Sequence, residues 1–388
     1  MKIGINGYEG VIPRFGYDLN GLPNRVGSSE VAFEWLIELN KIDKQNEYVI
    51  FLPVEPTSDL PREREGWRYE ILPNKPLWTI FALSPAIRKQ EFDVFFSPTH
   101  YGPLFAPCPQ VISILDISYK HFPKLFKKKD LLQLNLWGGY SVRSARKIIT
   151  ISRSSKDDII KEYHVPAARV HVAYLGIKEA NKSKMSKKEI LEKYSIEKTF
   201  ILFVGTLQPR KNIVRLVEAF SAVIHPRGES VLTSGVGEDL KLVIVGRRGW
   251  QYEEILEAPR RYGVEDRVRF LENVTDEELP AFYESAELFV LPSLYEGFGL
   301  PILEAMKYGC PVLTSNVSSL PEAGGDAAIY FNPEDVSDIA EKIEKVLSDK
   351  KLRDDMIKKG HEQVKKFSWE KSARQVLHTL EEAAKPVS

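Results

Sequence analysis

The sequence predicts an α/β protein of two domains, each built around a doubly wound parallel sheet. Short apolar runs alternate along the chain with longer segments of helical periodicity. Strands that alternate with helices are joined by right-handed crossovers and form mostly parallel sheets. The length of 388 residues is sufficient for two hydrophobic cores. A polar, Lys- and Ser-rich stretch at residues 178–188 is typical of a linker and divides the two series.

The first series occupies residues 1–177, which we assign to an N-terminal domain. Its first strand is predicted at residues 3–6, and a long structureless loop is expected from there to Gly27. Ser28 or Ser29 can cap the helix that follows. We consider Gly27 a candidate ligand-binding residue, with a simple turn as the equal alternative. The other strands of this domain are expected at residues 48–52, 68–72, 93–97, 111–115, 147–151 and 170–175.

Two loops of this domain carry polar side chains at predicted carboxyl ends of strands, where ligands of parallel sheets gather. His100 follows the strand at residues 93–97, and Asp116 follows the strand at residues 111–115. We consider both as candidate catalytic residues. The alternatives are that His100 is structural and that Asp116 caps the edge of the sheet.

The second series occupies residues 178–366, which we assign to a C-terminal domain, and a last helix is expected after Ser368 and Trp369. Gly246 follows one strand of this domain, at a point where a glycine lets a ligand approach the backbone closely. The strands are expected at residues 200–204, 240–245, 268–271, 288–291, 311–314 and 329–331.

The segment GTLQPRKN, from Gly205 to Asn212, follows the first strand of the second domain. Arg210 and Lys211 therefore lie in a loop between a strand end and a helix. Two adjacent cations suit a diphosphate there, Arg as a planar fork and Lys as a point charge. The alternative is a pair of solvated loop side chains.

The stretch LFVLPSLYEGFGLPILEAMKY predicts a buried strand, a glycine-containing loop and a helix opened by Pro301. Glu296 lies in the loop and Glu304 is expected in the first helical turn. The backbone amides between them suit a phosphate, because a helix N-terminus carries partial positive charge and unpaired N–H groups. These amides belong to Gly297, Phe298, Gly299 and Leu300.

Two carboxylates repel a diphosphate unless each faces a neutral polyol at one of its ends. A nucleotide sugar has that layout, so we assign Glu296 to the sugar and Glu304 to the ribose diol. The alternative is a surface loop followed by a helix with an acidic first turn. A helix start at residues 318–322 is expected to face the same site.

Composition restricts the partners and cofactors. The formal net charge is zero, so we expect no nucleic-acid partner. The only cysteines, Cys108 and Cys310, have no metal spacing and fit a reducing cytoplasm. Since no Asp-x-Asp triplet and no metal-type cluster occurs, we expect neither a metal nor a cofactor. No signal-peptide pattern or membrane-length apolar run is present, so a cytoplasmic location is expected.

Residues 120–161 hold eleven Lys or Arg against three Asp, with leucines and aromatic residues between them. Such a basic amphipathic surface can contact anionic lipid at the membrane or an anionic lipid-linked acceptor. The alternative, which we favour, is a core-packed helix with a solvated basic face.

Together, GTLQPRKN and the later pair of glutamates with seven residues between them resemble the signature of the retaining glycosyltransferases of family four (glycosyl transferases group 1). The resemblance covers almost the whole chain and implies the GT-B fold, in which two Rossmann-like domains face each other across a cleft. It implies that the N-terminal domain binds the acceptor, that the C-terminal domain binds a nucleotide sugar, and that a last helix at residues 367–388 crosses back onto the first domain.

The resemblance also implies an activity: metal-independent transfer of a hexose, with retention of configuration, to a glycan or lipid-linked acceptor. GDP-mannose is the sugar donor suggested by general likeness to mannosyltransferases. Gly27 is then expected near the donor phosphates, and Asn273 and Val274 beside the base. Related sequences usually carry His where this chain has Leu115. That departure leaves a non-catalytic nucleotide-sugar-binding subunit as an alternative, together with a nucleotide-sugar epimerase.

Overall fold

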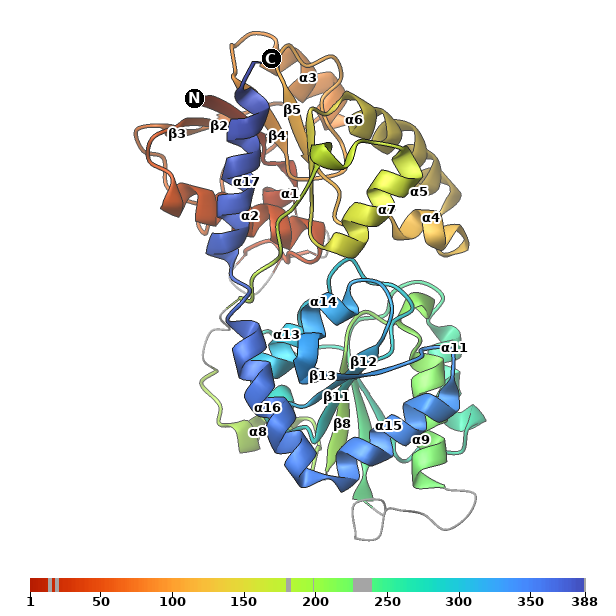
Figure 1. Ribbon diagram of the computed structural model, residues 1–388. Coiled ribbons are helices and arrows are strands. Elements are labelled where there is room, and N and C mark those ends of the chain that lie inside the picture. The colour runs from red at the N-terminus through yellow and green to blue at the C-terminus, as the bar shows by residue number, and fades with distance from the viewer. Residues whose placement is uncertain (13–15, 18–20, 179–182, 198, 226–238, 387–388) are drawn as a thin grey trace. The chain divides into compact units, whose positions relative to one another are not determined.

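The computed structural model describes residues 1–12, 16–17, 21–178, 183–197, 199–225 and 239–386. The chain divides into two compact units (Figure 1). Unit 1 comprises Met1–Gly176 and Phe367–Ser388, and unit 2 comprises Ile177–Lys366. Part of the stretch expected to be a linker, residues 179–182, lies outside the described residues.

Unit 1 contains a seven-stranded sheet in which all pairings are parallel, in the order β3-β2-β1-β4-β5-β6-β7. Most of its strands read as continuous apolar runs because helices cover both faces of a parallel sheet. The strands are β1 (Lys2–Asn6), β2 (Glu47–Leu52), β3 (Trp67–Ile71), β4 (Val94–Ser97), β5 (Gln110–Ser113), β6 (Lys147–Thr150) and β7 (Val170–Val172).

The loop after β1 departs from the prediction in two places. It contains a one-turn helix, so it is not structureless throughout. At its end Gly27, with φ 56°, is the N-cap of α2, and Ser29 instead bonds the backbone of Val26. The helices of unit 1 are α1 (Tyr8–Val11), α2 (Ser28–Ile42), α3 (Ser84–Ile87), α4 (Ser118–His121), α5 (Lys128–Gln133), α6 (Gly139–Ser144), α7 (Arg153–Tyr163) and α17 (Trp369–Ala384).

Helix α17 belongs to unit 1 although it ends the chain. Ser368 caps it by accepting a hydrogen bond from the amide of Lys371. The indole N–H of Trp35 on α2 donates a buried 2.9 Å hydrogen bond to the hydroxyl of Ser372. The two helices run side by side in Figure 1.

Unit 2 contains a six-stranded parallel sheet in the order β10-β9-β8-β11-β12-β13. Numbered from its own first strand, this is the order 3-2-1-4-5-6 of a Rossmann fold, which reverses direction between β8 and β11. The strands are β8 (Phe200–Val204), β9 (Lys241–Val245), β10 (Val268–Leu271), β11 (Leu288–Leu291), β12 (Val312–Ser315) and β13 (Ala328–Phe331).

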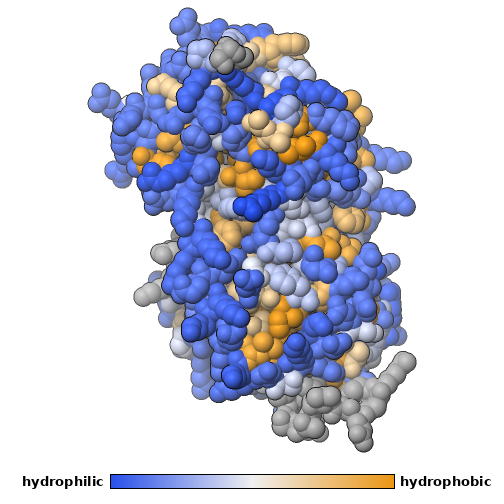
Figure 2. All heavy atoms as spheres, viewed as in Figure 1, coloured by the Kyte–Doolittle hydropathy of each residue, from blue (hydrophilic) through white to orange (hydrophobic). Residues whose placement is uncertain are grey.

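Helices lie on both faces of the unit 2 sheet (Figure 1). They are α8 (Lys187–Lys193), α9 (Ile213–Ile224), α11 (Glu253–Arg261), α12 (Leu279–Ser285), α13 (Leu300–Lys307), α14 (Leu320–Gly324), α15 (Val336–Ser348) and α16 (Lys350–Val364). Among the residues described, no helix combines the length and the apolar character needed to span a bilayer. The face shown in Figure 2 is largely hydrophilic, with apolar side chains gathered in small patches.

Candidate functional site

The site is built at the point where the strand order of unit 2 reverses. Strands β8 and β11 are neighbours in the sheet, and their carboxyl ends open into the loops at residues 205–212 and 292–299. The amide of Leu294 donates a 2.9 Å hydrogen bond to the carbonyl of Arg210, which ties the two loops together. Ligands of doubly wound sheets bind outside the carboxyl ends of the strands at such a reversal. Both sequence motifs therefore meet where a ligand is expected.

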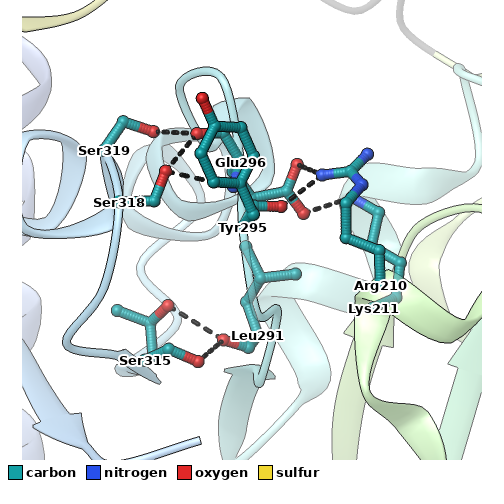
Figure 3. A network of polar contacts seen from close by, with 9 residues as sticks. Arg210, Lys211, Leu291, Tyr295, Glu296, Ser315, Ser318 and Ser319 are labelled. Atoms are coloured by element: carbon teal, nitrogen blue, oxygen red, sulfur yellow. Dashed lines mark hydrogen bonds and ion pairs between the residues drawn. The ribbon is translucent and has the colours of Figure 1, made fainter. Parts of the chain in front are cut away.

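Glu296 joins the basic pair of the first loop to the second loop (Figure 3). Its Oε2 lies 3.1 Å from a guanidinium nitrogen of Arg210, and its Oε1 lies 2.5 Å from Nζ of Lys211. Arg210 also donates a hydrogen bond to the carbonyl of Tyr295. All three charged side chains are largely buried, so two cations share one carboxylate in a poorly solvated place. This cluster carries a net positive charge, which suits an anion.

The pKa of Glu296 depends on its burial and on the two neighbouring cations. Burial alone would raise the pKa of this carboxyl group, because desolvation penalises the charged form. The positive charges of Lys211 and Arg210 outweigh burial and lower the pKa to about 2. Glu296 is consequently ionised at neutral pH and cannot serve there as a general acid.

Two serines hold the backbone of Glu296 from its other side (Figure 3). Ser318 and Ser319, just before α14, donate hydrogen bonds of 2.6 and 2.8 Å from their hydroxyls to the carbonyl of Glu296. The amide of Glu296 in turn donates to the hydroxyl of Ser318 at 3.3 Å. The helix start predicted at residues 318–322 thus supports the loop that carries the carboxylate.

Helix α13 follows this loop, and Gly299 is its N-cap with φ 101°. The predicted position of Glu304 in the first turn is wrong. The helix begins at Leu300, so Glu304 lies one turn further along and the first turn contains no acidic residue. The amides of Gly297, Phe298, Gly299 and Leu300 do lie at the start of this helix, as predicted.

Tyr283 on α12 is a residue that the sequence analysis missed. Its hydroxyl donates a 2.9 Å hydrogen bond to Oε2 of Glu304. Burial, and then the nearby Glu304 carboxylate, raise the pKa of Tyr283 well above its ordinary value, so the hydroxyl remains a donor. No signal in the sequence identified it, because a tyrosine on an amphipathic helix is typical of a core residue.

Gly246 has a packing role in the structure. A Cβ atom at this position would lie 1.9 Å from the carbonyl oxygen of Gly205, at the end of the adjacent strand. Only glycine therefore fits between these two strand ends. Asn273 and Val274 follow β10, and the carbonyl of Asn273 accepts a 3.1 Å hydrogen bond from Tyr194.

The candidate residues of unit 1 lie at the carboxyl ends of the neighbouring strands β4 and β5. His100 Nε2 is 3.2 Å from the carbonyl oxygen of Asp116. The carboxylate of Asp116 accepts a 2.8 Å hydrogen bond from the amide of Ser118, at the start of α4. Leu115 lies beyond the end of β5 and is buried. The structure thus brings His100 and Asp116 together through the Asp116 backbone.

Within the described part of the chain, no group of three His, Cys, Asp or Glu side chains has an arrangement that could hold a metal ion. Cys108 and Cys310 are both free thiols.

Known families and structures match this architecture. The family described as Glycosyltransferase Family 4 matches residues 43–180, and the family described as Glycosyl transferases group 1 matches residues 186–363. The O-antigen chain mannosyltransferase B of Escherichia coli is 34% identical over 296 residues, which cover 76% of this chain and 75% of that protein.

Solved structures share the fold at low sequence identity. Sucrose-phosphate synthase from Thermosynechococcus elongatus superposes with a TM-score of 0.72 at 18% identity, covering 99% of this chain and 100% of the other. Anabaena HepE in complex with UDP-glucose superposes with a TM-score of 0.70 at 18% identity, covering 98% and 100%. Together with the two parallel sheets, these structures confirm the predicted GT-B fold class.

Proposed function

The chain belongs to the glycosyl transferases group 1 family and is a glycosyltransferase, and from this premise we propose that it transfers mannose from GDP-mannose to a glycan or lipid-linked acceptor. The similarity to an O-antigen chain mannosyltransferase supports the choice of sugar and a role in surface polysaccharide assembly. We further propose that unit 2 binds the sugar donor and unit 1 binds the acceptor, in the cytoplasm.

One observation carries the proposed donor site: Arg210 and Lys211 converge on Glu296 at the loop that leads into α13. The diphosphate of the sugar donor binds this basic pair and the amides at the start of the helix. Glu296 holds the two cations in place and presents its carboxylate toward the sugar. Glu304, oriented by Tyr283, accepts hydrogen bonds from the ribose diol. Gly27, Gly205, Gly246, Asn273 and Val274 complete the proposed donor-binding set.

In the proposed reaction, an acceptor hydroxyl attacks the anomeric carbon on the face from which the diphosphate leaves, so configuration is retained. The bond between the anomeric carbon and the phosphate oxygen breaks, and its electron pair moves to the diphosphate. The departing phosphate oxygen takes the proton of the attacking hydroxyl. Arg210 and Lys211 stabilise the developing charge as fixed cations, which is how preorganised sites lower such barriers.

In unit 1, we assign His100 and Asp116 to the acceptor end of the reaction. The position at which related sequences carry His is Leu115, whose side chain neither donates nor accepts a hydrogen bond. His100 is near enough to the same loop to take over part of that role, since its ring nitrogen lies 3.2 Å from the Asp116 carbonyl.

The test combines binding and turnover. Thermal melting with GDP-mannose, UDP-glucose and the free nucleotides should show the largest stabilisation with the GDP compounds. Nucleotide release should then require an acceptor, persist in EDTA, and give a product with the anomeric configuration of the donor. Preference for UDP-sugars would replace the donor assignment. Stabilisation without turnover for any acceptor would favour the non-catalytic binding subunit.

A further inference from the structure

The segment at residues 124–136 presents apolar side chains on two different faces. Phe126, Leu131 and Leu134 pack against a core cluster of unit 1. Leu132 and Leu136, one helical turn apart, are 60% and 67% exposed. Packing against the core of unit 1 therefore accounts for Phe126, Leu131 and Leu134. It does not account for the two exposed leucines.

Some of the lysines in residues 120–161 are held in ion pairs, and others are exposed beside the same segment. Lys120 is paired with Glu162 at 2.9 Å, and Lys147 with Glu382 at 3.1 Å. Four exposed lysines lie within residues 124–129, and no carboxylate in the described part of the chain forms an ion pair with any of them. They are Lys124, Lys127, Lys128 and Lys129.

The apolar row continues beyond the two leucines. A π-helical turn, Leu134–Gly138, joins α5 to α6, and Tyr140 follows Leu136 by one turn. The rings of Tyr140 and Phe105 form a T-shaped pair at a centroid distance of 6.2 Å. Phe105 is 73% exposed. Lysines thus lie at one end of an exposed row of leucine and aromatic side chains.

We propose that this surface, formed by Lys127, Lys128, Lys129, Leu132, Leu136 and Phe105, binds an anionic lipid bilayer. Leucine and phenylalanine enter the boundary between headgroups and acyl chains, and the lysines contact anionic headgroups. A second copy of the chain is a poorer occupant, because a two-fold contact would bring like-charged lysines together. The proposal is independent of the sugar donor, since binding to lipid requires no turnover.

Sedimentation with vesicles tests this surface. The full chain should bind vesicles of phosphatidylglycerol and phosphatidylcholine, bind phosphatidylcholine alone at least tenfold more weakly, and weaken further at high salt. Leu132→Ser with Leu136→Ser should reduce binding to the anionic vesicles at least tenfold. Lys128→Glu with Lys129→Glu should do the same.

Two control variants distinguish binding through this surface from nonspecific binding to vesicles. Ile71→Ser removes an exposed apolar side chain from β3, an edge strand of the unit 1 sheet. Lys350→Glu with Lys351→Glu reverses two exposed charges on α16. Both should bind vesicles as the unchanged chain does, and all variants should keep the melting temperature and the nucleotide release with a water-soluble acceptor.

Three outcomes would overturn the proposal. The first is no binding of the full chain to anionic vesicles, and the second is equal binding by the leucine variant. The third is a dimer in light scattering that the leucine variant dissociates, which would assign the surface to a second copy. Failure of nucleotide release in the unchanged chain would instead bear on the proposed transferase reaction.

Discussion

Lys211 and Glu296 are separated by 85 positions in the sequence, and their Nζ and Oε1 atoms lie 2.5 Å apart in a buried place. The contact joins the loop after β8 to the loop after β11. A buried ion pair adds little net stability over an apolar pair of the same shape, but loss of one partner leaves an uncompensated charge. The three-residue cluster with Arg210 is therefore sensitive to substitution of any member.

Glu296→Gln should destabilise the chain because it leaves Arg210 and Lys211 buried without a counter-charge. We expect the free energy of unfolding at pH 7 to fall by about 3 kcal/mol. Urea unfolding followed by circular dichroism measures it. Glu277→Gln, at an exposed position of the same unit, is the control and should change the value by less than about 0.5 kcal/mol. Equal stability of the two variants would contradict a charge cluster of this strength.

The same carboxylate should make stability depend on pH in acid. The pKa of Glu296 is about 2 in the folded chain, against 4.5 for an ordinary Glu. Between these two values the unfolded chain binds more protons than the folded chain. The contribution of Glu296 to the free energy of unfolding is therefore fully present above pH 4.5 and is lost as pH falls toward 2. The gap in unfolding free energy between the unchanged chain and Glu296→Gln should shrink by up to about 1.4 kcal/mol per pH unit there. A gap that stays constant down to pH 3 would show that the folded pKa is not lowered.

The strands of this chain were predictable because parallel strands buried on both faces are apolar throughout. The loop that carries Arg210 and Lys211 was also predictable as a connection between a strand and a helix, since an apolar run precedes it and a segment of helical periodicity follows it. Its contact with Glu296 was not, because two residues far apart in sequence meet only through the pairing of β8 with β11. The bond from Tyr283 to Glu304 depends in the same way on how α12 packs beside α13. Sequence periodicity gives the buried face of a helix, and it does not give the partner of one hydroxyl.

Arg210→Ala should lower kcat by roughly 10² to 10³ if the guanidinium meets charge that develops on the leaving diphosphate. Arg210→Lys should recover part of this loss, because it keeps the charge and loses the planar fork. Initial-rate measurements of nucleotide release give kcat and KM separately. Arg269→Ala, an exposed arginine on β10, is the control. A kcat that does not change in Arg210→Ala would remove this residue from the reaction.

Gly299→Ala tests the turn that opens α13. With φ 101°, this position is strained for any residue with a side chain, and the new Cβ would lie 2.9 Å from Cδ2 of Leu320. Gly263 also has positive φ, at 68°, with no described atom within 4 Å of an added Cβ. Gly263→Ala should therefore cost about 1 kcal/mol of unfolding free energy, and Gly299→Ala clearly more. Only Gly299→Ala should also weaken binding of nucleoside diphosphates in calorimetry.

Tyr283→Phe should raise the KM for the sugar donor by roughly three- to tenfold and leave kcat nearly unchanged. The hydroxyl orients Glu304 through one hydrogen bond, which is worth about 1 kcal/mol, and Glu304 is proposed to bind the unreactive ribose. Glu304→Gln should raise KM as well, and the double variant should be less affected than the two single effects combined, since the residues are in contact.

Tyr262→Phe provides the matched control for this substitution. Tyr262 is the C-cap of α11, and its hydroxyl donates a hydrogen bond of the same length, 2.9 Å, to Glu218 on α9. Loss of that bond should lower stability to a similar extent and leave KM for the sugar donor unchanged. If both phenylalanine variants raise KM equally, the effect is one of general stability, and Glu304 has no special role in binding the donor.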